Sequence, residues 1–159
     1  MLVPRIEAAR LDDVPALAVL VEALFRLEPD FQPDQAAQAR GLRRLIEAGP
    51  DRARVAVARG PDGPAGLALA QLVVSTSEGG LSAWIEDVYV LPDRRGQGIG
   101  RALIDDVLAW ATSAGATRAQ LLADGGNHAA LAFYRRLGWE ATGLLPLRRR
   151  LGHGAVRDE

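Results

Sequence analysis

Cysteine is absent from the 159-residue chain, so disulfide bridges, thiolate metal sites and a cysteine nucleophile are excluded. Lysine is absent as well, since all 19 cationic residues are arginine, and this excludes a Schiff-base lysine and the lysine of a P-loop. Only His128 and His153 carry imidazoles, and neither stands in an H-E-x-x-H motif or beside paired acids. We therefore expect no metal site, and carboxylates, hydroxyls and backbone groups remain for chemistry.

Long apolar runs and a charge excess are also missing. No segment approaches the roughly 18 apolar residues that cross a bilayer, and the N-terminus has no apolar signal segment. The net charge of −1 and the pI near 6.1 lack the basic field of nucleic-acid binders. With 48% hydrophobic and 25% charged residues, the composition predicts one cytoplasmic globular domain over residues 1–159, with neither nucleic acid nor membrane as a partner.

Hydrophobic periodicity and turn residues predict alternating strands and helices along the chain. Aspartates at 12–13 and 34 are expected to cap two helices, and Gly79 and Gly80 to follow a hairpin of two strands. From residue 84 to 123 the order is strand, helix, strand, which requires a right-handed crossover and makes these two strands parallel. A short helix and an extended segment follow. The pattern predicts an α+β fold (three-layer α/β) with a mixed, mostly antiparallel sheet.

The most informative segment is the glycine-rich turn Asp93–Arg101, which follows a strand and opens a helix. Glycines at alternate positions leave successive backbone N–H groups uncovered, and the helix behind them adds the positive end of its dipole. The turn is therefore a candidate phosphate site. The alternative is a turn that needs glycine only to bend, because Arg101 stands where the Rossmann motif has its third glycine and no Gly-Lys-Ser or Gly-Lys-Thr follows.

Two motifs in register resemble those of the GNAT N-acetyltransferase superfamily. Arg95-x-x-Gly98-x-Gly100, between a strand and an amphipathic helix, is similar to its acetyl-CoA motif. The second signature resembles Asn127-x-x-Ala130-x-x-Phe133-Tyr134-x-x-x-Gly138-Trp139, with tryptophan where phenylalanine or tyrosine is commoner. The resemblance implies a single GNAT domain over 1–159, a six- or seven-stranded sheet flanked by about four helices, and acetyl-CoA as acyl donor without a metal.

The resemblance also implies which residues hold the cosubstrate. The pyrophosphate would lie on N–H groups of the turn, and backbone groups of Val88 and Val90 would pair with the pantetheine arm. Asn127 would contact the same arm, and its alternative role is an ordinary helix N-cap. The residues implied in the turn are Arg95, Gly96, Gln97, Gly98, Gly100 and Arg101.

Acetylation of an amine requires a proton acceptor, because an alkyl ammonium of pKa about 10.4 is protonated at pH 7. Glu86 and Asp87 are adjacent acids in an otherwise apolar strand, and alternation predicts that they point to opposite faces with one of them buried. Burial raises a carboxylate pKa toward the range of a useful base. Resemblance to polyamine-type members favours Glu86 as the base, Asp87 is the next candidate, and the alternative is that both cap loops or pair with arginines.

Tyr134 occupies the position at which the family has the acid that meets the departing CoA sulfur. Since a phenol of pKa about 10 is a weaker acid than a thiol of pKa about 8.5, we expect modest assistance. The alternative for Tyr134 is core packing beside Phe133 and Leu137.

The acceptor is the open part of the prediction. The loop of residues 27–34 carries three acids and suits a cationic primary amine of a small molecule, such as a polyamine, amino sugar or amino acid. The alternatives are a protein N-terminus or side chain, and a sensor module that binds acetyl-CoA without catalysis. Arg148–Arg150 could meet a CoA phosphate, a homodimer partner or solvent, and solvent is the expectation.

Overall fold

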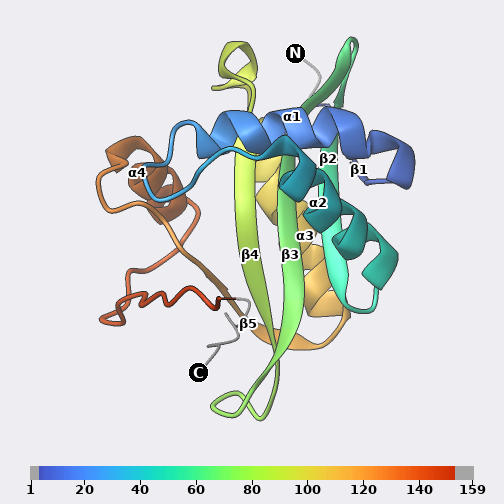
Figure 1. Ribbon diagram of the computed structural model, residues 1–159. Helices are drawn as coiled ribbons and strands as arrows, with labels where there is room; N and C mark the ends of the chain where they lie inside the picture. The colour runs from blue at the N-terminus through green and yellow to red at the C-terminus, as the bar shows by residue number, and fades with distance from the viewer. Residues whose placement is uncertain (1–3, 153–159) are drawn as a thin grey trace, which may run out of the picture. The chain divides into compact units, whose positions relative to one another are not determined.

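A computed structural model describes residues 4–152. Five strands, four α-helices and two short 3-10 turns alternate along the chain (Figure 1). Their order is β1 (Arg5–Ala8), a turn (Leu11–Asp13), α1 (Val14–Phe25), α2 (Gln35–Ala48), β2 (Ala53–Gly60), β3 (Gly63–Ser75), β4 (Gly80–Val90), a turn (Pro92–Arg94), α3 (Ile99–Ser113), β5 (Ala116–Leu121) and α4 (His128–Arg136).

The five strands form one mixed sheet in the order β1-β2-β3-β4-β5. The first four pair antiparallel and β5 pairs parallel to β4, which confirms the predicted crossover through α3. Helices α1 and α2 cover one face of the sheet and α3 covers the other (Figure 1), so the three-layer fold class is confirmed. The strand count differs from the expected six or seven, because residues 139–152 form no strand; Gly143 and Pro146 in this segment both weaken strand pairing.

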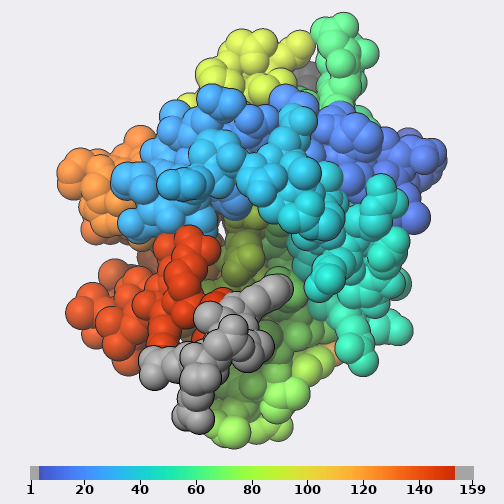
Figure 2. Space-filling model, in the orientation of Figure 1, coloured from blue at the N-terminus to red at the C-terminus, as the bar shows by residue number. Residues whose placement is uncertain are grey.

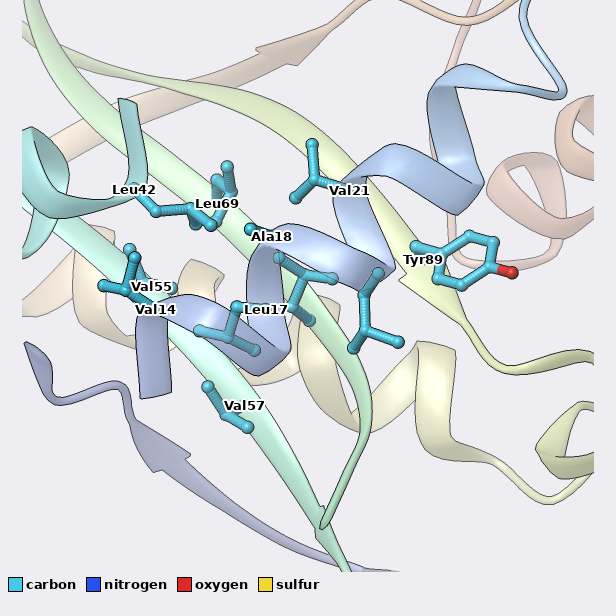
Figure 3. Close-up of a cluster of buried hydrophobic side chains, with 11 residues drawn as sticks. Val14, Leu17, Ala18, Val21, Leu42, Val55, Val57, Leu69 and Tyr89 are labelled. Atoms are coloured by element: carbon cyan, nitrogen blue, oxygen red, sulfur yellow. The ribbon is translucent and has the colours of Figure 1, made fainter. Parts of the chain in front are cut away.

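The core on the α1 and α2 face joins aliphatic side chains of both helices to the inward residues of β2 and β3 (Figure 3). Leu17 and Leu67 are fully buried there. Tyr89 of β4 closes one end of the cluster, and its hydroxyl points away from the aliphatic side chains (Figure 3). Burial of each such side chain contributes about 1.5–3 kcal/mol, so this cluster fixes α1 over the end of β4.

Polar contacts fix where the first two helices begin. Arg59 of β2 donates to Asp13 (Nη2–Oδ2, 2.9 Å) and to Glu7 (Nε–Oε2, 3.1 Å), which ties the start of α1 to the sheet. The hydrogen bond from Arg59 lowers the pKa of Asp13. Asp34 caps α2 by accepting from the N–H of Ala37 at 3.0 Å, as the sequence predicts.

On the visible face, α1 and α2 cover the upper part of the sheet (Figure 2).

The described chain falls into two compact units, of which the first ends at Asp124 and the second begins at Gly125. The sheet and α1 to α3 belong to the first unit, and α4 belongs to the second. Within residues 4–152, no helix combines the length and apolarity that a membrane span requires.

Candidate active site

Strand β4 carries a bulge at its two acidic residues. Leu69 of β3 pairs with Glu86 and Leu67 pairs with Tyr89, so two residues of β4 stand opposite one residue of β3. Asp87 has φ of +48° and is the non-glycine residue with positive φ in the described chain. Such a backbone is rare outside glycine, asparagine and aspartate and often marks a functional position. The regular alternation that places Glu86 and Asp87 on opposite faces therefore does not apply here.

The bulge gives the two acids different environments. Asp87 is half-buried, and burial raises its pKa to about 7, with smaller contributions from the charges of Glu86 and Glu28. Glu86 is exposed and accepts a hydrogen bond from the indole of Trp84 (Nε1–Oε1, 3.0 Å). A carboxylate that titrates near neutral pH can both take up and release a proton at physiological pH. Asp87 has this property.

A third acid, Glu28, lies on the connection between α1 and α2. Burial raises its pKa, and the charges of Asp124 and Asp30 raise it further. Within residues 4–152, no salt bridge forms to Glu28, Glu86 or Asp87, whereas Asp13 and Asp106 pair with arginines. In the same residues no group of three acids or histidines has metal-binding geometry. Repulsion between neighbouring acids thus adds to burial in raising the pKa of Glu28 and of Asp87.

Beyond the bulge, β4 and β5 separate. Their parallel pairing runs from Leu81 to Ile85 on β4 and ends at the pair Ile85 with Leu121. Val88 and Val90 lie past this last pair; Val90 pairs with Gly66 of β3, and Val88 lies within the bulge. We call this unpaired stretch of β4 beside the end of β5 the wedge, and its backbone groups have no partner on β5, as strand addition requires.

The closed end of this wedge is held by Arg118 of β5. Its guanidinium donates to Ser77 (Nη1–Oγ, 3.0 Å) and to Ser75 (Nη2–Oγ, 3.1 Å) at the turn between β3 and β4. The hydroxyl of Ser82, a buried residue of β4, donates to the Arg118 carbonyl at 3.2 Å. This network fixes the strands where they meet and leaves their other ends apart.

The glycine turn follows β4 directly and leads into α3. Gly96 and Gly98 have φ of +73° and +81°, the left-handed region that favours glycine. A Cβ at either position would meet no protein atom within 4 Å, so the space beside the turn is open. The first helical hydrogen bond of α3 runs from Ala102 N to Gly98 O. The preceding N–H groups therefore have no helical acceptor and can serve an anion.

The side chains of the turn make local contacts. Arg95 donates from Nε to the carbonyl of Val90 at 2.9 Å, and its guanidinium lies over the ring of Tyr89, 5.5 Å from the centroid. Gln97 donates to the carbonyl of Asp93 at 3.3 Å. Arg101 lies in the first turn of α3 and faces Asp105 at 3.6 Å. These contacts use side-chain atoms and leave the backbone N–H groups of Gln97 and Arg101 available.

The remaining two predicted residues lie in the second unit. Asn127 caps α4 by accepting from the N–H of Ala130 at 3.0 Å, so its expected capping role is confirmed and a cosubstrate contact stays a prediction. Tyr134 packs edge-to-face against Phe133 and Trp139, with ring centroids 5.2 and 5.9 Å apart. Every other predicted residue lies in the first unit, on β4 or on the glycine turn and the start of α3 that follow it: Glu86, Val88, Val90, Arg95, Gly96, Gln97, Gly98, Gly100 and Arg101.

Comparison with known proteins identifies the family. The model of the acetyltransferase (GNAT) family matches residues 20–139. An uncharacterised N-acetyltransferase of Methanocaldococcus jannaschii is 41% identical over 58 residues, which cover 36% of this chain and 26% of that protein.

Solved structures extend the similarity over nearly the whole chain. A candidate acetyltransferase of Agrobacterium tumefaciens is 25% identical, with 92% of this chain and 99% of that chain covered and a TM-score of 0.76. Glucosamine-6-phosphate N-acetyltransferase of Arabidopsis thaliana shares the fold with 18% identity, 91% and 97% coverage and a TM-score of 0.71. Because the family match spans β4, the glycine turn and α4 together, the chain belongs to the GNAT acetyltransferase family.

Proposed function

We propose that this protein transfers the acetyl group of acetyl-CoA to a primary amine of a small, cationic molecule. The observation that carries the proposal is the bulge in β4, where the half-buried carboxyl of Asp87 follows the last β4 pair with β5 by two residues and has a pKa raised by burial and by the charges of Glu86 and Glu28. The backbone groups of the wedge can pair with the pantetheine arm of the donor, and the carboxylates of Glu28, Glu86 and Asp87 can bind a cationic amine.

The residues of the first unit fit the donor. Backbone N–H groups from Gln97 to Arg101 would hold the pyrophosphate, with no side chain of Gly96 or Gly98 in the way. Val88 would offer backbone groups to the pantetheine arm. Val90 offers fewer, because its carbonyl already accepts from Arg95. Acetyl-CoA, when bound, supplies the activated thioester.

Asp87 is proposed as the base in place of Glu86. The acceptor enters as an ammonium, and the Asp87 carboxylate takes one of its protons, so that the neutral nitrogen forms a C–N bond with the acetyl carbon while the C–S bond breaks. CoA leaves as a thiolate, and the second proton lost by the nitrogen converts this thiolate to the CoA thiol. A pKa of about 7 makes this proton transfer less unfavourable than transfer to an ordinary aspartate of pKa about 3.9. Glu86, fixed by Trp84, would keep the amine nearby through its charge.

The charge balance supports a cationic acceptor. Glu28 and Glu86 have no arginine partner in the described chain, and the half-burial of Glu28 makes unneutralised charge costly. A second ammonium on the acceptor would remain charged after the attacking nitrogen loses its proton. We therefore expect diamines to be better acceptors than monoamines of equal length.

The test measures CoA thiol release from acetyl-CoA with matched acceptors: 1,4-diaminobutane, 1-aminobutane, glucosamine, amino acids and short peptides with free N-termini. We expect turnover with the small amines and the highest kcat/KM with the diamine. Turnover with the peptides and with none of the small amines would contradict a small-molecule acceptor and indicate that the acceptor is a protein. Binding of acetyl-CoA without turnover across the panel would instead indicate a sensor.

Tyr134 stays a prediction that one substitution tests. Tyr134→Phe keeps the ring contacts with Phe133 and Trp139 and removes only the hydroxyl. We expect kcat to fall by about 10²-fold, the low end for general acid assistance, because the phenol is a weak proton donor. An acyl donor with a more acidic thiol should restore the activity of Tyr134→Phe, because a better leaving group needs less protonation. It should not restore Asp87→Asn, which lacks the proposed base. Initial rates of both variants with acetyl-CoA and with this donor provide the measurement.

A further inference from the structure

The side chain of Arg95 contacts the end of β4 and leaves the anion-binding N–H groups to the backbone. Its Nε lies 2.9 Å from the carbonyl oxygen of Val90, five residues earlier in the chain. The guanidinium also covers the ring of Tyr89, whose other neighbours belong to the core under α1. A side chain of the glycine turn is thereby attached to the strand that borders the wedge.

The backbone explains how Arg95 can reach back. Arg95 itself is extended, with φ of −72° and ψ of 161°, and the left-handed Gly96 and Gly98 follow it at once. The chain reverses after Arg95, so its side chain lies against β4 while the next N–H groups lead into α3. Arg94, one residue earlier, makes only loose pairs with Asp62 and Asp93, at 3.9 and 3.7 Å.

We propose that Arg95 is a positioning residue that holds the end of β4 and the glycine turn in one geometry, so that the two halves of a CoA molecule bind as a single ligand. This proposal rests on the proposed function, because the nucleotide half would lie on the turn and the pantetheine half along β4. Without the Arg95 contacts, binding of the whole ligand has to order the turn relative to β4, and the affinity falls by that cost.

The expected signature is a difference between two ligands. The nucleotide half of CoA, adenosine 3′-phosphate 5′-diphosphate, touches the turn alone and does not depend on its placement relative to β4. Acetyl-CoA depends on it. For Arg95→Ala we expect acetyl-CoA to bind about tenfold more weakly, the effect of one hydrogen bond from a charged group, and the nucleotide half to change by less than about twofold.

Calorimetric dissociation constants of both ligands for four proteins provide the test: the native protein, Arg95→Ala, Arg95→Lys and Arg94→Ala. Arg95→Lys keeps the charge but lacks the planar group that reaches Val90 and covers Tyr89, so it should resemble Arg95→Ala. Arg94→Ala removes the same charge from the neighbouring position and should bind both ligands normally. Unfolding temperatures establish that each variant is folded, which the exposure of Arg95 favours.

Three results would overturn the proposal. Equal weakening of both ligands in Arg95→Ala, or full recovery in Arg95→Lys, would make Arg95 a direct electrostatic contact to phosphate. Unchanged binding of acetyl-CoA in Arg95→Ala would leave it without a role in the site. Failure of the native protein to bind acetyl-CoA would reject the proposed function itself, which is a separate outcome from these three.

Discussion

Gly98→Asp is expected to weaken acetyl-CoA binding by more than about a thousandfold, because a carboxylate placed against a pyrophosphate costs several kcal/mol. The fold should survive. Gly98 has φ of +81°, which aspartate tolerates better than most residues, and its Cβ would meet no protein atom within 4 Å. Titration calorimetry with the purified variant measures the loss.

Two controls separate charge from backbone strain. Gly98→Asn has nearly the same shape and the same tolerance of positive φ without the charge, so it should lose much less affinity than Gly98→Asp. Gly79→Asp places the same side chain at another exposed glycine with positive φ, on the turn between β3 and β4, and should bind normally. A folded Gly98→Asp protein with native affinity would show that no anion lies on the turn.

Asp87→Asn is expected to lower kcat/KM at pH 7 by about 10²- to 10⁴-fold, the usual range for loss of general base assistance. Asparagine fits the left-handed backbone of this position, so the bulge should be kept. In the native protein kcat/KM should fall tenfold per pH unit below about pH 7, where Asp87 becomes protonated. In the variant this break should disappear, and the rate should rise with the fraction of free amine.

The matched comparison is Glu86→Gln in the neighbouring position. Because Glu86 acts through its charge in our proposal, its loss should mainly raise KM for the acceptor and leave the break in the pH profile. If Glu86 is the base, as the family resemblance implies, the reverse is expected. A Glu86→Gln enzyme without the break, beside an Asp87→Asn enzyme that keeps it, would return the role to Glu86.

Asp87→Asn should raise the stability of the protein while it lowers its activity. The folded pKa of Asp87 is raised from 3.8 to about 7, so the native state binds more protons than the unfolded state between these values, and stability falls as pH rises through that window. Asp87→Asn removes the penalty. We expect the variant to be more stable than the native protein by about 2–4 kcal/mol at pH 8 and equally stable below about pH 4, as denaturant unfolding at both pH values will measure.

Features that depend on local chemistry could be predicted from the sequence. Asp34 and Asn127 cap their helices, and the glycine turn lies between a strand and a helix as its composition requires. The parallel pairing of β4 with β5 follows from chain order and handedness alone. The caps and the turn are predictable because the residues that determine them lie within a few positions in the sequence. The parallel pairing is predictable because the handedness rule applies to nearly every strand–helix–strand unit.

The bulge at Asp87 could not be predicted in this way. Strand patterns assume that side chains alternate, and no glycine marks the residue at which alternation fails. The bulge depends on the pairing of Leu67 and Leu69 with β4, which is a property of another strand. The contact between Arg95 and Val90 was missed for a related reason, since a motif identifies the residue type but not the direction of its side chain.

The short pairing of β4 with β5 also determines how the sheet can move. Strand β5 pairs with β4 only after the chain has passed through the whole of α3, so this pairing closes a long loop. The pairs that it forms are few, and they offset little of the entropy lost on closure. Small local openings of β5 should therefore cost less than openings of the longer antiparallel pairs of β2 with β3 and β3 with β4. Arg118 holds the start of β5 to the turn between β3 and β4. We therefore expect such openings to separate β5 from β4 at the end of β5, beside the wedge, while the start of the strand stays attached.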